Sequence, residues 1–167
     1  LMSKEYTLGV VLVRLGRYAI GVFKGDTLIS SKTASRYVKG RHHAGGTSQK
    51  RFERIREGQI ARLYQKVCLI TQEKFSPIEH QLDYIFLGGE KFTLRKFIDK
   101  CPYLQKKSNA ILKRVLAVSE PNQQSLLQAP REVWKSLVIT IGNQSDQIGT
   151  RSEHSLLLPN HAPDNIY

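Results

Sequence analysis

Apolar residues recur at two spacings along this chain, and the two spacings predict the order of its strands and helices. Short apolar runs at residues 7–13, 18–23 and 27–31 are separated by glycine-containing turns, as in a three-stranded antiparallel meander. From Gln49 onward the apolar positions are Phe52, Ile55, Ile60, Leu63, Val67 and Ile70. This three-to-five-residue spacing predicts a long helix with one apolar and one basic face, and Ser48 as its N-cap.

The second half of the chain alternates strand and helix patterns. We expect strands over residues 82–87 and 113–118, a helix over 91–100, and a final helix over 122–138 in which Pro130 predicts a break or a new first turn. Strands joined through a helix pair in parallel. The predicted fold class is therefore α/β: a mixed sheet of about five strands, an N-terminal meander followed by a β-α-β unit, flanked by helices.

The length of 167 residues suits one domain, which we place at residues 5–141. Residues 142–167 are rich in Asn, Gln, Ser, Asp and Pro and should form a tail or linker. Cys68 and Cys101 lie in apolar helical patterns, without metal-ligand spacing, and we expect them to be reduced core thiols of a cytoplasmic protein. No stretch approaches the roughly 20 apolar residues of a membrane span.

Positive charge is concentrated in one part of the chain. The sequence holds 26 Lys and Arg against 14 Asp and Glu, a net charge of +12. Residues 32–66 alone carry ten of the cations and only two acids, Glu53 and Glu57. A basic excess of this kind favours a polyanionic partner such as RNA, although a solvated basic helix face would give the same composition.

Hydrophobic periodicity stops between Thr33 and Ser48, and Gly, His, Lys and Arg replace it. A loop that no core requires is a candidate functional segment. It contains Gly45-Gly46-Thr47-Ser48-Gln49, followed by Lys50 and the pair Arg51-Phe52.

The order of elements and this loop resemble the middle, tRNA-hydrolysing domain of eukaryotic and archaeal peptide chain release factors, an architecture related to ribonuclease H. In that family Gly-Gly-Gln leads into a helix with an Arg-Phe pair. Here the third position is Thr47 and the glutamine stands two places later. Gly-Gly followed by Ser-Gln is typical of a related branch, the Vms-one-like release factors, which are peptidyl-tRNA hydrolases of ribosome quality control. The resemblance covers roughly residues 5–140.

The resemblance implies a function and a set of site residues. Gly45, Gly46 and Gln49 carry over as the catalytic group, whereas Thr47 does not. Because we find neither a codon-reading nor a partner-binding domain beside the resembling part, we expect codon-independent release of nascent chains from peptidyl-tRNA on stalled ribosomes or large subunits. The protein would be a monomer, without cofactor and without membrane contact.

The chemistry of the loop agrees with this expectation. A glutamine amide does not titrate near neutrality, so Gln49 can position water and hydrogen-bond to developing charge but cannot act as a general base. Gly45 and Gly46 lack a Cβ, which permits a close backbone approach to an RNA terminus. The residues expected to contact RNA phosphates are Lys39, Arg41, His42, His43, Lys50, Arg51 and Arg54.

Other interpretations stay open at this point. His42 or His43 would suit a general base, but a metal site there lacks further ligands in the loop, and we expect none. Arg56 and Arg62 would simply be solvated. A non-catalytic module that binds ribosomal or other structured RNA would share the basic surface. A metal-dependent nuclease of the ribonuclease H type needs converging carboxylates, for which Asp26, Asp83 and Glu90 are the poorly placed candidates.

Overall fold

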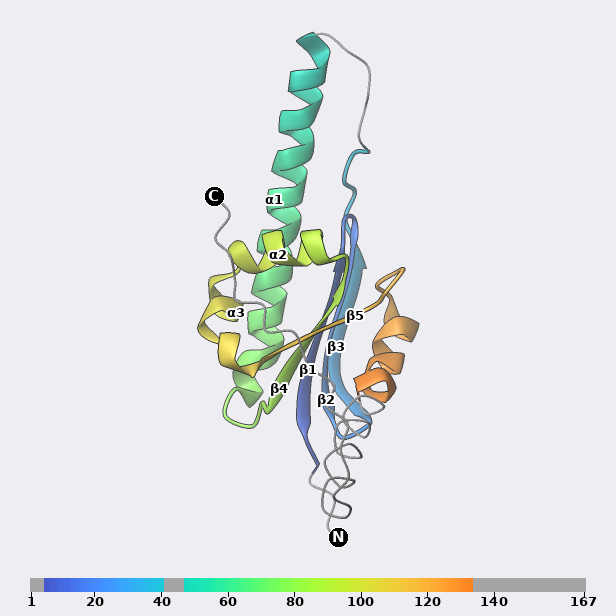
Figure 1. The fold of residues 1–167 in the computed structure, drawn as a ribbon, viewed down its shortest axis with the longest axis vertical. Helices are drawn as coiled ribbons and strands as arrows, with labels where there is room; N and C mark the ends of the chain where they lie inside the picture. Colours follow the sequence, from blue (N-terminus) through green and yellow to red (C-terminus); the bar gives the residue numbers. More distant parts are fainter. Residues whose placement is uncertain (1–4, 41–46, 134–167) are drawn as a thin grey trace, which may run out of the picture. The chain divides into compact units, whose positions relative to one another are not determined.

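The computed structural model describes residues 5–40 and 47–133, with Thr47 described by its backbone alone. One sheet of five strands runs through this part of the chain (Figure 1). Its strands are β1 (Thr7–Arg14), β2 (Arg17–Lys24), β3 (Thr27–Ser35), β4 (Tyr84–Gly89) and β5 (Ile111–Leu116). The helices are α1 (Thr47–Phe75), α2 (Lys91–Asp99) and α3 (Pro102–Lys106), with short 3-10 turns at Ser76–Ile78 and Ser108–Ala110.

The strand order is β3-β2-β1-β4-β5. The first three strands pair antiparallel, whereas β4 pairs parallel with both β1 and β5. Strand β1 is central, and only Arg14 at its end is exposed. The predicted α/β class, with a meander followed by a parallel β-α-β unit, is therefore confirmed.

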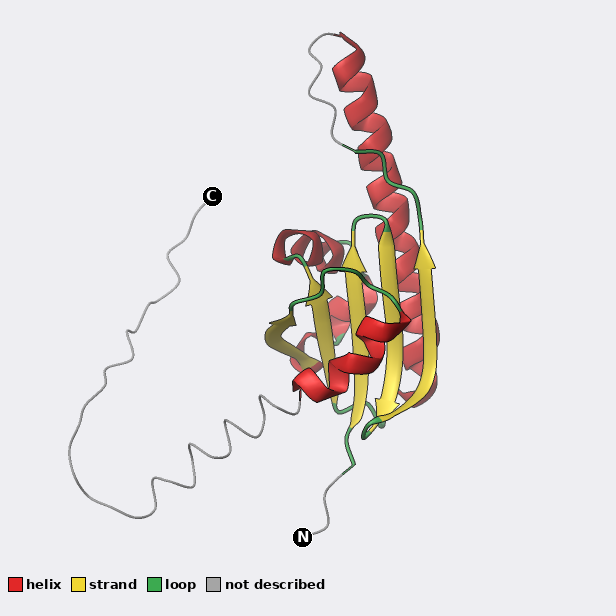
Figure 2. Cartoon of the chain, turned by 90° about the vertical axis from the view of Figure 1, so that its right-hand side faces the viewer, coloured by secondary structure: helices red, strands yellow, loops and turns green. Residues whose placement is uncertain are grey.

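Helices cover both faces of the sheet. Helices α1, α2 and α3 pack on one face, and the helical residues 123–133 lie on the other (Figure 2). Gly9 makes room for the end of α1, because a Cβ there would stand 2.6 Å from the Phe75 ring. On the opposite face, a Cβ on Gly21 would meet Leu126 at 3.0 Å. The strands therefore contribute to two packed layers, which is why β1 is apolar almost throughout.

Strand β3 extends further than the sequence pattern suggests. We expected a strand over 27–31 and a loop from Thr33, but the strand continues to Ser35. It lies at the edge of the sheet, and its residues are half-buried or exposed. An edge strand can therefore form without the apolar alternation that we used to find strands.

Helix α1 consists of two unlike parts. Its 29 residues span about 43 Å at the usual helical rise. The packed half, residues 63–75, holds the buried residues Leu63, Val67 and Ile70, as expected. Residues 47–62, here called the arm, run past the end of the sheet (Figures 1 and 2). The expected apolar face reaches Ile60, which is partly buried against the core, but does not continue beyond it, because Phe52 is 36% and Ile55 42% exposed. None of the described helices has the length and apolar character that crossing a membrane requires.

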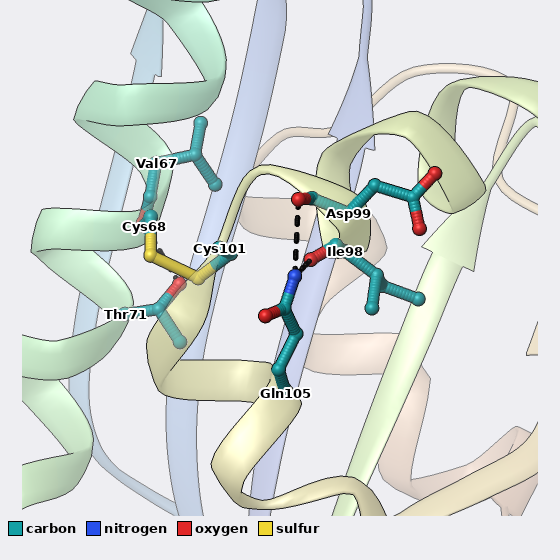
Figure 3. The surroundings of a disulfide bond; sticks show 7 residues. All are labelled: Val67, Cys68, Thr71, Ile98, Asp99, Cys101 and Gln105. Atoms are coloured by element: carbon teal, nitrogen blue, oxygen red, sulfur yellow. Dashed lines mark hydrogen bonds between the residues drawn. A yellow bond between two sulfur atoms is a disulfide. The ribbon is translucent and has the colours of Figure 1, made fainter.

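A disulfide joins α1 to the segment between α2 and α3. Cys68 and Cys101 are bonded, with their Cα atoms 5.4 Å apart (Figure 3). The expectation of two reduced thiols is therefore wrong. Beside the bond, the Gln105 amide donates to the carbonyl oxygens of Ile98 and Asp99 at the end of α2, each at 3.0 Å. The turn that carries Cys101 is held on both sides.

The last described helix passes through its proline. Residues 123–133 are helical without interruption, so the break expected at Pro130 is absent from this stretch. Asn122 caps the helix reciprocally: its Oδ1 accepts from Ser125 N at 2.8 Å, and its own N–H donates to Ser125 Oγ at 2.9 Å. Ala129 and Val133 are buried, and this packing offsets the hydrogen bond that proline cannot make. The expected continuation to Val138 and the expected tail, residues 142–167, lie outside the described residues.

Candidate functional site on the arm of helix α1

The arm places a row of polar and basic side chains beyond the sheet. It is built from residues with good helix propensity, chiefly Arg, Lys, Glu and Gln. It carries five cations and two carboxylates, and its first turn holds no acidic residue. The positive end of the helix dipole therefore adds to the positive charge of the side chains. This end of α1 is suited to a polyanion.

Gln49 lies on the first turn of α1. The helix begins at Thr47, so Gln49 is its third residue and Ser48 lies inside the helix rather than at the expected N-cap. The side chain is half-buried, and its Nε2 donates to Glu53 Oε1 at 3.1 Å, one turn further along. Gln49 is therefore held by a fixed backbone and a side-chain partner on the same helix.

The chain entering the loop is fastened to the arm before residue 41. The N–H of Lys39 donates to Gln59 Oε1 at 2.8 Å, and Arg56 Nε donates to the carbonyl oxygen of Lys39 at 3.0 Å. The Lys39 ammonium lies over the Phe52 ring, 3.8 Å from its centroid. Both backbone groups of Lys39 are thus bonded to side chains of the arm, and we call this set of contacts the Lys39 clamp.

The clamp corrects one expectation and adds a contact to another residue. Arg56 is not simply solvated, because its guanidinium holds the backbone of Lys39. The Lys39 ammonium, for which we expect an RNA phosphate partner, lies over an aromatic ring, and its contact with RNA stays a prediction. Gln59 takes part in the site although no motif marks it, and Phe52, known from the Arg-Phe pair, contacts Lys39, which the motif did not indicate. Whether a side chain lies opposite a particular backbone group depends on the fold of the whole domain. The local sequence therefore does not predict a contact such as that between Gln59 and Lys39.

The other expected site residues divide into two groups. Lys50, Arg51 and Arg54 are exposed along the arm. Gly45, Gly46, Arg41, His42 and His43 lie outside the described residues. The structure therefore brings Gln49, Lys50, Arg51 and Arg54 together on consecutive turns of one helix, with Lys39 bonded alongside.

The tyrosines at the base of the arm do not supply a base for catalysis. Burial raises the pKa of the Tyr64 phenol, and the nearby Glu90 carboxylate raises it further. Burial also raises the pKa of Tyr18, against the effect of Arg36. Both phenols are protonated near neutral pH, so neither removes a proton from water.

Two of the three carboxylates considered for a nuclease form hydrogen bonds within the fold. Asp83 accepts a hydrogen bond from the Thr7 N–H at 2.8 Å, and Glu90 accepts from the Thr93 hydroxyl at 2.5 Å. In the part of the chain that the structure describes, no three His, Cys, Asp or Glu side chains gather as a metal site would require. Two-metal nuclease chemistry thus finds no support among these residues.

Comparison with known proteins covers most of the described chain. Residues 6–139 match the family described as Actinobacteria/chloroflexi VLRF1 release factor. Peptide chain release factor subunit 1 of Methanopyrus kandleri is 30% identical over 136 residues, which are 81% of this chain and 33% of that protein. The Methanococcus maripaludis protein of the same name is 33% identical over 94 residues, 55% of this chain and 22% of its own length.

The fold is similar to that of part of a solved structure. The crystal structure of archaeal translation termination factor aRF1 superposes with a TM-score of 0.58 and 18% identity, over 86% of this chain and 42% of that one. The matched part of this chain spans between 22% and 33% of the length of these curated relatives. Because the family match extends over the meander, the loop, the arm and the parallel strands, this chain belongs to the VLRF1 release factor family.

Proposed function

We propose that this chain hydrolyses the ester of peptidyl-tRNA on stalled ribosomes or large ribosomal subunits, without reading a codon, and so frees the nascent chain. One observation carries the proposal. In a member of the VLRF1 release factor family, Gln49 lies on the first turn of a basic arm that runs past the sheet. A residue so placed can enter a site that the folded body is too wide to enter.

The proposed chemistry is water attack on the ester that joins the peptide to the tRNA. Gln49 orients the water and hydrogen-bonds to the charge that develops, because its amide does not titrate near neutrality. Its Nε2 already has Glu53 as a partner, so Oε1 is the atom through which it would hold the water. Gly45 and Gly46 would let the backbone approach the tRNA end. The remaining pocket would come from ribosomal RNA.

The basic residues support RNA as the partner of this chain. Phosphates of tRNA and ribosomal RNA would be neutralised by Lys39, Arg41, His42, His43, Lys50, Arg51 and Arg54. The backbone of Lys39 would at the same time position the loop through the clamp. Binding of the chain to these RNAs should therefore weaken steeply as the salt concentration rises. A monomeric chain acting in the cytoplasm, with residues 5–141 as the working domain, remains part of the proposal.

The test is release of peptide from peptidyl-tRNA on large subunits that carry no messenger RNA. Gln49→Ala should lower the rate by about 10²–10³-fold, as removal of one oriented donor or acceptor does in other hydrolases. Gly46→Ala should lower it as well. Gln65→Ala is the matched control, since Gln65 is an exposed glutamine on the packed half of the same helix. Subunit binding by Gln49→Ala should be unchanged.

Three outcomes would contradict the proposal. Release by Gln49→Ala at the wild-type rate would show that Gln49 does not carry the reaction. Absence of release by the wild-type chain, with binding to the subunit retained, would leave a non-catalytic module that binds RNA. A rate that falls in acid with a midpoint near 6.5, and that His42→Ala or His43→Ala abolishes, would assign the proton transfer to histidine instead.

A further inference from the structure

A basic hollow lies at the end of the sheet where β1 turns into β2 and β3 ends. Its volume is about 790 Å³, and its lining comes from the β1–β2 turn, from the chain leaving β3 and from residues 119–121. Arg14, Arg17 and Arg36 line it together with Tyr37 and Glu120. Three guanidinium groups thus surround it with a single carboxylate. None of these residues belongs to the arm or to the Lys39 clamp.

Two of the arginines stand directly opposite each other. Arg14 and Arg17 are partners in the antiparallel register, and like charges in that arrangement repel. Arg17 pairs with Glu120, and Arg14 Nη1 donates to the Ser119 carbonyl oxygen at 2.6 Å. The carboxylate offsets one charge, which leaves the hollow with the excess of two cations. A bound anion would relieve this repulsion.

Tyr37 adds an aromatic surface at the same place. Its side chain is 75% exposed, the highest fraction among the exposed large hydrophobic residues of the described chain. The backbone on either side is fixed, since Arg36 N–H donates to the Gly16 carbonyl at 2.7 Å and Lys39 N–H donates to Gln59. The ring is therefore presented to solvent from an anchored backbone. An exposed ring beside cations is the arrangement on which unpaired bases of RNA stack.

We propose that this hollow binds one nucleotide of unpaired RNA, with its base on Tyr37 and its phosphate on Arg36 and Arg14. The inference shares an RNA partner with the proposed hydrolase and adds a contact that does not involve Gln49. Val38 also lines the hollow and directly precedes Lys39, so the hollow adjoins the clamp along the backbone. RNA held in the hollow would lie beside the root of the arm and fix its direction.

The experiment measures binding of the whole chain to a fluorescently labelled 12-nucleotide oligouridine by anisotropy, over a range of salt. Tyr37→Ala should weaken binding about tenfold with an unchanged salt slope, whereas Tyr37→Phe should bind as the wild type does. Arg36→Ala should reduce the salt slope by about one. Phe92→Ala is the matched control, because Phe92 is 57% exposed on α2 and Lys96 lies 4.5 Å from the centroid of its ring.

Several results would overturn the inference. Equal affinity of Tyr37→Ala and Phe92→Ala would show that the exposed ring has no part in binding. Equal competition by a polyglutamate peptide of the same charge would make the hollow a general anion site rather than a nucleotide site. Gln49→Ala should bind the oligonucleotide normally, so failure of the hydrolase proposal leaves this one standing. An unchanged unfolding midpoint in Tyr37→Ala would show that its loss of affinity is not a loss of fold.

Discussion

The two halves of helix α1 are covalently continuous but held by different forces. Residues 63–75 bury Leu63, Val67 and Ile70 against the sheet, and a disulfide fixes them further. The arm, residues 47–62, has no fully buried residue with a described side chain, and side-chain hydrogen bonds and charge dominate it. The packed half therefore sets the position of the arm, whereas packing places little constraint on the side chains of the arm itself. Changes in the two halves should therefore affect different measurements.

The disulfide should make the largest difference, and it belongs to the packed half. It links residues 33 positions apart, so closing that loop in the unfolded chain stabilises the native state by about 4 kcal/mol. Urea unfolding with and without a reductant should show this loss. The double variant Cys68→Ser, Cys101→Ser is the control, and its midpoint should not respond to the reductant. A wild-type midpoint that is insensitive to reductant would contradict the bond.

Two isoleucines of the same helix allow a matched comparison of its halves. Ile70 is 4% exposed and Ile55 is 42% exposed. Ile70→Ala should lower the free energy of unfolding by about 3 kcal/mol, because it removes buried methyl groups and leaves a cavity. Ile55→Ala should cost under about 1 kcal/mol, as expected for a partly exposed side chain. Equal losses in a urea titration would mean that the arm is packed like the rest of α1.

The same division explains what the sequence could and could not predict. Apolar periodicity found the central strands, the parallel unit and the packed half, because burial against the sheet selects apolar residues at those positions. It failed for Lys32–Ser35, whose edge strand is only half-buried, and at Pro130, where buried neighbours outweigh a local rule. It also gave no sign of the short helix α3, which buries one residue, Leu104.

The candidate site was predictable only in part. The motif around Gln49 is local, so sequence placed it at the start of the helix. Long-range partners are not local: Cys68 and Cys101 come together through the packing of α1 on the α2–α3 turn. Gln59 accepts a hydrogen bond from Lys39 although the two residues are 20 positions apart in the sequence. Such contacts depend on the fold as a whole and on no pattern within one segment.

Gln59→Ala should show how far the arm depends on the Lys39 clamp. The Lys39 N–H would lose its acceptor, which should cost about 1 kcal/mol of stability. If poorer positioning of the loop also removed about 1 kcal/mol of transition-state stabilisation, peptide release would slow about fivefold. Gln65→Ala, on the packed half but exposed, should change neither unfolding nor release. A stability loss without any loss of release would separate the clamp from the proposed activity.

The smallest expected effect comes from Glu53, and it separates positioning from charge. Its Oε1 accepts from Gln49 Nε2 in an exposed hydrogen bond, so Glu53→Ala should lower kcat for release about two- to threefold and leave stability unchanged. Removing a carboxylate from a basic arm should at the same time tighten RNA binding and lower KM. Glu53→Gln keeps an acceptor oxygen without the charge, so it should recover kcat and keep the lower KM. If Glu53→Gln and Glu53→Ala lose kcat equally, the carboxylate acts through its charge and the hydrogen bond does not position Gln49.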